Sequence, residues 1–287
     1  MEAIQVSVPR LHPLDDYLRT DRLPHTLCPG CGIGIALNAF LRAVNELSSE
    51  GKLDRRNILF IGGIGCTARM SMYTMFDSAH VTHGRAIPFA TGARLANPNI
   101  IPVVFSGDGD LAGIGGNHLI HAARRNMDLL VVVINNMTYG LTGGQLSPTT
   151  PTGHYTTTTP YGNPERPFNL VPLIAAAGGN YVARASITQP EVMKSYFKKA
   201  LIKEGFRFIE VVSTCPENYG RHLGYKSPAD FYLKIKEVVK MRSGIKPWDA
   251  KYDWSSEITI GEFIDRNEPG FSKSLYEQIS KVRNSEN

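Results

Sequence analysis

The sequence of 287 residues contains only four cysteines and no apolar run long enough to cross a bilayer. We therefore expect no membrane-spanning segment. The first 22 residues have neither an apolar core nor a small-residue cleavage site, so they argue against export and favour a cytoplasmic location. In a cytoplasmic protein of this size, so few cysteines indicate metal or redox use rather than a disulfide framework.

Clustered positive charge is also missing from the sequence. The net charge is +5 and the pI is near 9.0, yet Lys and Arg are scattered and no nucleic-acid-binding motif occurs. We therefore expect no nucleic-acid partner. The main interpretation is an ordinary solvated surface, although a mildly positive field also suits an acidic electron carrier.

What the sequence does contain is an alternation of strand and helix patterns. The predicted strands cover residues 57–62, 101–105, 129–134, 181–185 and 208–212, and the predicted helices cover 33–47, 86–97, 114–125, 171–177 and 189–203. The strands at 101–105 and 129–134 are continuous apolar runs, a pattern typical of strands buried on both faces of a parallel sheet. The alternation predicts an α/β fold with a doubly wound parallel sheet.

Three regions are expected along the chain. Residues 1–24 form an N-terminal arm lying on the body or on a partner, and residues 25–215 form the α/β domain. Residues 216–287 form a C-terminal extension, with a helix predicted over 228–241. Residues 147–166 form a loop rich in Thr, Pro and Gly, and loops of this length are often functional or lie at interfaces.

Polar residues follow two neighbouring predicted strands. Gly107-Asp108-Gly109 comes after the first strand, and Asn135-Asn136 comes after the second. In open α/β sheets, ligands bind where the carboxyl ends of the strands meet. Carboxylate and amide oxygens suit Mg²⁺ bridging to phosphates, and the glycines let backbone N–H groups approach a diphosphate. The alternative is an ordinary glycine turn without a ligand.

Three interpretations of the cysteines remain open from their spacing. Cys28 and Cys31 form a C-x-x-C pair, whereas Cys66 and Cys215 are isolated in Gly- or Pro-flanked turns. Structural zinc sites draw their ligands from close knuckles, which this arrangement lacks. A [4Fe–4S] cluster takes four thiolates and tolerates scattered ligands. The spacing favours a cluster over a zinc site or unrelated buried thiols.

The order of these motifs resembles a known family. GDG, then NN about 25 residues later, then TYGLTGGQ resembles the diphosphate motif of thiamine diphosphate (ThDP) enzymes. From about Leu23 to Gly220 the chain resembles β subunits of 2-oxoacid:ferredoxin oxidoreductases. The resemblance implies three cofactors: ThDP, Mg²⁺ and a [4Fe–4S] cluster. The cluster ligands implied by the CPGCG, GIGC and C-P segments are Cys28, Cys31, Cys66 and Cys215.

The resemblance also implies a role for each residue of the ThDP site. Asp108 and Asn136, through their side chains, and Thr138, through its carbonyl, would hold Mg²⁺. The other residues expected at the cofactor are Gly65, Cys66, Gly107, Gly109, Asp110 and Thr142.

Three residues are expected near the substrate. Arg69 would meet a carboxylate bidentately, and His83 would donate to the substrate or cofactor from an HGR segment that also contains Arg85. The alternatives are a surface or interface Arg69 and a structural His83.

The implied reaction is the oxidative decarboxylation of a 2-oxoacid with coenzyme A, which gives an acyl-CoA, CO₂ and reduced ferredoxin. The LPHTLCPGCGIG segment and Leu141 before TGGQ are most similar to the 2-oxoglutarate type, with branched-chain 2-oxoacid and pyruvate types as alternatives. No position matches the glutamate that ThDP enzymes place at the aminopyrimidine. In the family it comes from the α subunit, so we expect a chain inactive alone and a dimer of αβ pairs.

Two rival classes remain. One is a ThDP enzyme without a cluster, such as a non-oxidative decarboxylase, which gives no reason for four well-placed cysteines. The other is a non-catalytic, zinc-bound subunit of a larger assembly, which would have no affinity for ThDP.

Overall fold

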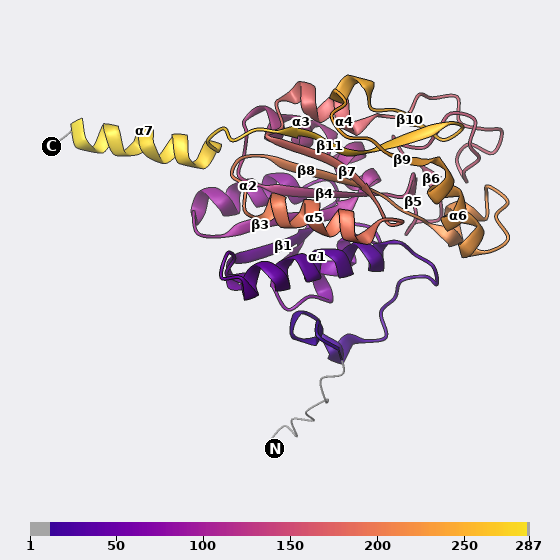
Figure 1. Cartoon of the computed structure of the whole chain (residues 1–287), viewed down its shortest axis with the longest axis horizontal. Helices are drawn as coiled ribbons and strands as arrows, with labels where there is room; N and C mark the ends of the chain where they lie inside the picture. The colour runs from indigo at the N-terminus through magenta and orange to yellow at the C-terminus, as the bar shows by residue number, and fades with distance from the viewer. Residues whose placement is uncertain (1–11, 286–287) are drawn as a thin grey trace, which may run out of the picture.

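The structure is a computed structural model that describes residues 12–285. The first eleven residues of the predicted N-terminal arm lie outside the described residues. A sheet of nine strands runs through the centre of the molecule, with helices on both faces (Figure 1). The predicted α/β class is confirmed.

The strands of the main sheet follow the order β10-β11-β7-β8-β4-β3-β1-β2, with β9 beside β11. Their bounds are Ile58–Gly62 (β1), Asp77–His80 (β2), Ile101–Gly107 (β3), Leu130–Asn135 (β4), Tyr181–Ser186 (β7), Arg207–Val212 (β8), Val239–Met241 (β9), Tyr252–Asp253 (β10) and Glu257–Asp265 (β11). β1, β3, β4, β7 and β8 pair in parallel, as predicted, and β2, which the sequence did not predict, pairs in parallel with β1. β11 runs antiparallel to β7, so the sheet continues into the C-terminal part of the chain.

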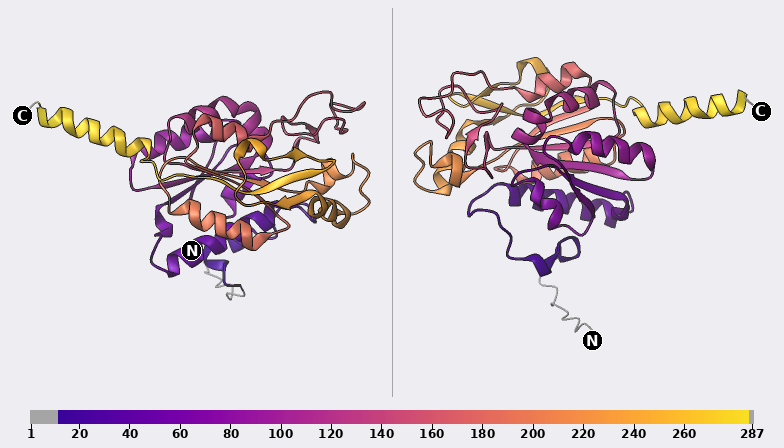
Figure 2. Two further views of the ribbon diagram at one scale, coloured as in Figure 1. Left: turned by 45° about the horizontal axis from the view of Figure 1, so that its top comes forward. Right: turned by 180° about the vertical axis from the view of Figure 1, so that it is seen from behind.

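Helices cover the two faces of the sheet as two layers (Figure 2). α1 (Ile33–Ser49) and α5 (Pro190–Leu201) pack on one face. α2 (Ala86–Ala96), α3 (Gly116–Arg124) and α4 (Leu170–Ala177) pack on the other. Successive residues of a strand point to opposite faces. Val132 of β4 therefore belongs to the first core, and its neighbours Val131 and Val133 belong to the second.

Phe40 of α1 lies at the centre of the first core. Its side chain is fully buried, and its ring contacts those of Phe60, Phe105 and Phe197 at centroid distances of 5.6, 6.1 and 5.6 Å. We expect Phe40→Ala to lower the free energy of unfolding by about 3–5 kcal/mol, because the removed ring leaves a cavity. Denaturant unfolding measures this, with the exposed Asn38→Ala on the same helix as the control. Equal effects of the two changes would contradict the packing described.

The remaining elements lie at the ends of the sheet. α6 (Pro228–Val238) begins with a capping box, in which the Ser227 and Asp230 side chains each accept a hydrogen bond from the other's backbone N–H. The helix predicted over 228–241 is three residues too long, because its last residues form β9. α7 (Phe271–Ser285) projects away from the body (Figures 1 and 2).

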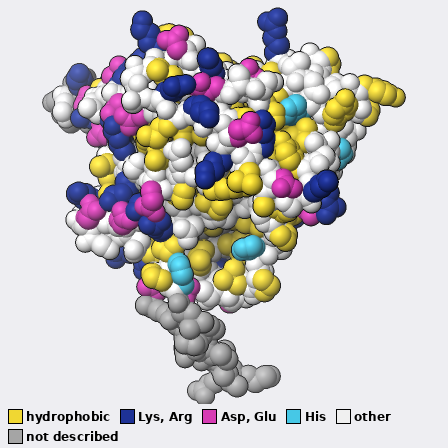
Figure 3. All heavy atoms as spheres, turned by 45° about the vertical axis from the view of Figure 1, so that its right-hand side comes forward, with side chains coloured by type: hydrophobic (Ala, Val, Ile, Leu, Met, Phe, Trp, Pro, Cys, Tyr) yellow, Lys and Arg dark blue, Asp and Glu magenta, His cyan; other side chains and the backbone are white. Residues whose placement is uncertain are grey.

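A short hairpin, β5 (Thr138–Tyr139) and β6 (Gln145–Leu146), lies beyond the carboxyl end of β4. The molecular face on that side carries many hydrophobic side chains (Figure 3). Among the described residues, no helix is long and apolar enough to cross a membrane. The predicted boundaries at residues 24 and 215 stay predictions.

Candidate active site

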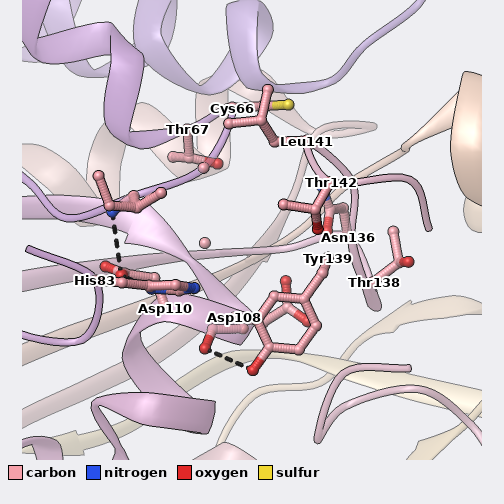
Figure 4. Close-up of a pocket in the computed structure, with 15 residues that line it drawn as sticks. Cys66, Thr67, His83, Asp108, Asp110, Asn136, Thr138, Tyr139, Leu141 and Thr142 are labelled. Carbon is pink, nitrogen blue, oxygen red and sulfur yellow. Dashed lines mark hydrogen bonds and ion pairs between the residues drawn. The ribbon is translucent and has the colours of Figure 1, made fainter. Parts of the chain in front are cut away.

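A pocket lies at the carboxyl ends of β1, β3 and β4, where the sequence predicted a ligand site (Figure 4). Among the residues that line it are the predicted Gly65, Cys66, His83, Gly107, Asp108, Gly109, Asp110, Asn136, Thr138 and Thr142. Four segments that are distant in sequence, after β1, β2, β3 and β4, thus meet around one cavity. Arg69, Arg85 and three of the four cysteines do not line it.

The turn after β3 continues as a π-helical segment over Gly109–Ile114, whereas the sequence predicts a loop here and a helix from Ile114. A Cβ on Gly109 would collide with the ring of Tyr139, and a Cβ on Gly113 would collide with its hydroxyl. The Tyr139 hydroxyl donates to the Gly109 carbonyl at 3.0 Å. Glycine is therefore required for the close approach of the two loops that form the pocket walls.

Three oxygen atoms converge at the floor of the pocket. In one orientation the Asn136 amide nitrogen donates to the Thr138 carbonyl at 2.9 Å and to Asp108 Oδ1 at 3.1 Å. In the other orientation the amide oxygen takes the same place, and three oxygens then face one another without a proton between them. Hard cations such as Mg²⁺ prefer this set of ligands. The arrangement fits a cation bound by Asp108, Asn136 and Thr138.

Asp108 is 1% exposed. Its second carboxylate oxygen, Oδ2, faces away from the three converging oxygens and accepts hydrogen bonds from hydroxyl groups. Oδ2 accepts hydrogen bonds from Ser147 Oγ and Thr149 Oγ1, each at 2.6 Å. Burial raises the pKa of Asp108 to about 6, although these hydrogen bonds act in the opposite direction. A cation at Oδ1 would favour the ionised form, so the carboxylate is prepared for metal binding.

A buried network of hydrogen bonds and one ion pair fixes the position of Thr149, which in turn binds Asp108. The Tyr252 hydroxyl of β10 donates to the Thr149 carbonyl at 2.9 Å and accepts from Asn135 Nδ2 at 3.1 Å. Asn135 also donates to Glu210 Oε1 at 2.7 Å, and the other oxygen of Glu210 pairs with Arg184 at 2.7 Å. Of the two adjacent asparagines, Asn136 lines the pocket and Asn135 is a structural residue.

Asp110 organises the rim of the pocket. Its Oδ1 accepts hydrogen bonds from the backbone N–H groups of Gly84 at 2.7 Å and Ile64 at 3.2 Å. It also lies 2.5 Å from Nδ1 of His83 (Figure 4). A carboxylate at Nδ1 favours a proton there, which leaves Nε2 as the acceptor of the neutral ring. Asp110 thus holds His83 and two loops in place.

The two predicted arginines have different surroundings. Arg69 is half-buried; burial raises the pKa of the Cys66 thiol, and the charge of Arg69 partly opposes this shift. Arg85 is exposed, and its side chain donates to the Gly84 carbonyl at 3.2 Å. The structure therefore places Arg69 near Cys66, and it brings neither Arg69 nor Arg85 into the lining of the pocket.

The four cysteines are free thiols that influence one another electrostatically. Burial and neighbouring thiols raise the pKa of Cys31 to about 11 and that of Cys215 to about 12. Cys66 lines the active-site pocket, and Cys28 and Cys31 line a separate hollow beside α6. A Cβ on Gly140 would lie 3.1 Å from Cys215 Sγ, so this thiol lies close to the pocket loop.

The four thiols lie near enough to act on one another, as the ligands of a shared cluster would have to. Among residues 12–285, no three His, Cys, Asp or Glu side chains meet as ligands of one metal ion would. A [4Fe–4S] cluster distributes four thiolates over four iron atoms, so its ligands need not converge at one point.

Sequence reasoning missed several residues that shape the pocket. Thr67 and Tyr139 line it, and Ser147 and Thr149 bind Asp108. Tyr139 belonged to the recognised TYGLTGGQ segment but had no role assigned. The hydroxyl-rich composition of residues 147–166 was the available signal for Ser147 and Thr149.

Comparison with known proteins first defines the class. Residues 63–211 match the C-terminal TPP binding domain of thiamine pyrophosphate enzymes. This segment contains the whole pocket lining, so the fold and the site define a thiamine diphosphate-dependent enzyme subunit.

Comparisons over the whole chain are more specific. The chain is 46% identical to the 2-oxoglutarate synthase subunit KorB of Methanocaldococcus jannaschii, over 95% of this chain and 99% of that protein. It is 35% identical to the 2-oxoacid:ferredoxin oxidoreductase subunit beta of a Sulfolobus species, over 82% of this chain and 80% of that one.

The structure is similar to a 2-oxoglutarate:ferredoxin oxidoreductase from Magnetococcus marinus solved with 2-oxoglutarate, coenzyme A and succinyl-CoA bound. The TM-score is 0.82 at 32% identity, over 95% of this chain and 91% of that one. The chain belongs to the β-subunit family of the 2-oxoacid:ferredoxin oxidoreductases, as its motifs predicted.

Proposed function

We propose that this chain is the β subunit of a 2-oxoglutarate:ferredoxin oxidoreductase. With coenzyme A, the enzyme converts 2-oxoglutarate to succinyl-CoA and CO₂ and passes the electrons to ferredoxin. The observation that carries the proposal is the pocket in which a triad of cation-binding oxygens lies near Cys66. The names of the relatives, which refer to 2-oxoglutarate, support this substrate over pyruvate and branched-chain 2-oxoacids.

The residues of the pocket suit ThDP and Mg²⁺. When bound, ThDP supplies a carbon nucleophile and an electron sink for decarboxylation. Asp108, Asn136 and Thr138 would hold Mg²⁺ on the diphosphate, and the turn at Gly107 and Gly109 would bring backbone N–H groups close to it. His83, oriented by Asp110, would present Nε2 to the cofactor or substrate.

The four cysteines would hold a [4Fe–4S] cluster, which supplies a one-electron acceptor when bound. Ligation needs thiolates, and the pKa values of Cys31 and Cys215 lie well above neutral pH. Cluster assembly must therefore release protons. Cys66 belongs to both sites, so it would place the cluster beside the ThDP pocket.

A partner subunit would complete the pocket. Among the described residues that line it there is no glutamate, which ThDP requires at its aminopyrimidine. Ile64 and Leu141 of the lining are 39% and 38% exposed, and a partner would cover them. We therefore propose an α subunit that supplies the glutamate, in a dimer of αβ pairs.

The pKa of Asp108 predicts a pH dependence for cofactor binding. Metal binding needs the ionised carboxylate, whose pKa without the metal is raised to about 6 by burial. We expect the Mg²⁺-dependent affinity for ThDP to be constant above pH 7 and to fall by up to about tenfold for each pH unit below 6. Fluorescence titration with ThDP from pH 5 to 8 measures this. An affinity that does not change across this range would contradict the assignment of Asp108.

The proposed function is tested on the complex purified anaerobically through this chain. Reduction of ferredoxin or a viologen is measured with coenzyme A and, separately, 2-oxoglutarate, pyruvate and 2-oxoisovalerate. We expect a clear preference for 2-oxoglutarate, and no activity from this chain alone. Preference for another 2-oxoacid would reject the substrate, and full activity of the isolated chain would reject the shared site.

A further inference from the structure

A second pocket lies at the other end of the parallel strands from the candidate active site. It is formed at the amino ends of β3 and β8 and beside the first turn of α7. In Figure 1 this is the side from which α7 leaves the body. The charged residues that line it are Lys52, Arg94, Lys203 and Arg207, together with Asp128 and Glu204. Nothing in the proposed reaction uses this pocket.

Arg207 is buried in this pocket without a full set of partners. The residue is 3% exposed, and its Nη1 donates to the Gly205 carbonyl at 2.9 Å. Its Nε is buried and has no hydrogen-bond acceptor. The charges of Asp128 and Glu204 act on Arg207 from a distance. A buried charged donor without an acceptor is costly, so this site lacks an acceptor for the Nε of Arg207.

Arg94 adds a second guanidinium with the same deficiency. Its Nη1 donates to the carbonyls of Pro98 and Ile100, but its Nε is also buried without an acceptor. Burial lowers the pKa of Arg207 to about 10; the charge of Asp128 opposes this lowering, and the nearby charge of Arg94 contributes to it. The two guanidinium groups are therefore close enough to repel each other.

The charge of Asp128 acts on both arginines, but its carboxylate oxygens accept hydrogen bonds from other groups. Asp128 accepts from the backbone N–H groups of Gly205 and Ser272, each at 2.9 Å. Glu204 is exposed. The two lysines differ from the arginines, since Lys52 pairs with Glu50 at 2.8 Å and Lys203 pairs with Asp265 at 2.7 Å.

Helix ends offer only a partial explanation of these charges. α2 and α5 end at this edge, and the partial negative charge of a helix C-terminus attracts cations. That attraction accounts for a positive charge in the last turn of α2, where Arg94 lies. It supplies no acceptor for the buried Nε atoms of Arg94 and Arg207.

We propose that this pocket binds a small oxyanion, the phosphate or carboxylate group of a free metabolite, between Arg94 and Arg207. Guanidinium groups present a fork of N–H donors that matches two oxygens of such a group. The ligand would stabilise the subunit at the edge remote from the candidate active site. The proposal does not depend on the proposed function.

The test uses the complex saturated with ThDP and Mg²⁺, so that anions do not compete for the diphosphate site. Inorganic phosphate and acetate are titrated separately by calorimetry and by the shift in Tm, with chloride keeping the ionic strength constant. We expect saturable binding of at least one of them. The stronger binder identifies the chemical group.

Variants assign that binding to the pocket. Arg94→Gln should weaken it by at least about tenfold, because a charged hydrogen-bonding group is lost. Arg124→Gln, an exposed control at the end of α3 with the same charge change, should bind like the unmodified protein.

Arg207→Lys keeps the positive charge but loses the fork of guanidinium N–H donors, so it should also bind the anion more weakly. If Arg207→Lys does not fold, Arg94→Gln decides alone. No saturable response to either anion, or equal responses of Arg94→Gln and Arg124→Gln, would overturn the proposal.

Discussion

Asp108→Asn is expected to weaken Mg²⁺-dependent ThDP binding by at least about 100-fold, since even partners that only support a metal ligand are worth 10–100-fold. The substitution keeps the size of the side chain but removes the only carboxylate among the three converging oxygens. It also replaces one carboxylate oxygen with an NH₂ group, which would face either the hydroxyls of Ser147 and Thr149 or the cation. Equilibrium binding of ThDP at increasing Mg²⁺ concentrations measures the loss.

Ser147→Ala is the matched control for this prediction. It removes one hydrogen bond to Asp108 Oδ2 and leaves the carboxylate and the second hydroxyl in place. We expect a loss of about 3–10-fold, the value of one hydrogen bond to a charged group. If Asp108→Asn bound ThDP as well as Ser147→Ala, Asp108 would not be a metal ligand.

Cys66→Ser is expected to abolish electron transfer to ferredoxin while ThDP binding stays within about threefold of the unmodified protein. Cys66 would be a cluster ligand, but its side chain is not part of the oxygen triad that would bind Mg²⁺. Iron and acid-labile sulfide analysis of the anaerobically purified complex, together with the rate of viologen reduction, measures the effect.

The neighbouring Thr67→Ser, which removes one methyl group from the pocket lining, is the control for Cys66→Ser. It should leave iron content and viologen reduction unchanged. Zinc in place of iron in the unmodified protein would reject the cluster and favour the structural-zinc interpretation of the four cysteines. Full activity and iron content of Cys66→Ser would exclude Cys66 as a ligand.

The parts of the fold that could be predicted are those with strong local signals. The continuous apolar run of β4 and the glycine turn after β3 fix a buried strand and a ligand edge. β2 could not be predicted because its sequence, Asp-Ser-Ala-His, is mostly polar. It becomes a strand only by pairing with β1 at the edge of the sheet. β11 was hidden in an acidic segment that pairs with β7 across a long sequence separation.

In the candidate site, too, residues with a local sequence signal could be predicted, and contacts between distant segments could not. Sequence motifs could identify Asp108 and Asn136, since both follow strands directly. They could not separate the roles of Asn135 and Asn136, because these residues are adjacent and only the structure shows which one turns toward Glu210. Nor could they predict that Asp110 holds His83, or that Arg94 and Arg207 share a pocket, because those contacts join distant segments.

The hydrogen bond between Tyr252 and Thr149 has a consequence for biosynthesis. Chains fold from the N-terminus as they are made, and the strands that carry Asp108 and Asn136 are synthesised long before β10. Until Tyr252 has been synthesised, the loop whose Thr149 binds the Asp108 carboxylate lacks the hydrogen bond from the Tyr252 hydroxyl. Capture of ThDP should therefore follow the completion of nearly the whole polypeptide. A nascent or truncated β chain would then remain without cofactor even where its glycine turn has already formed.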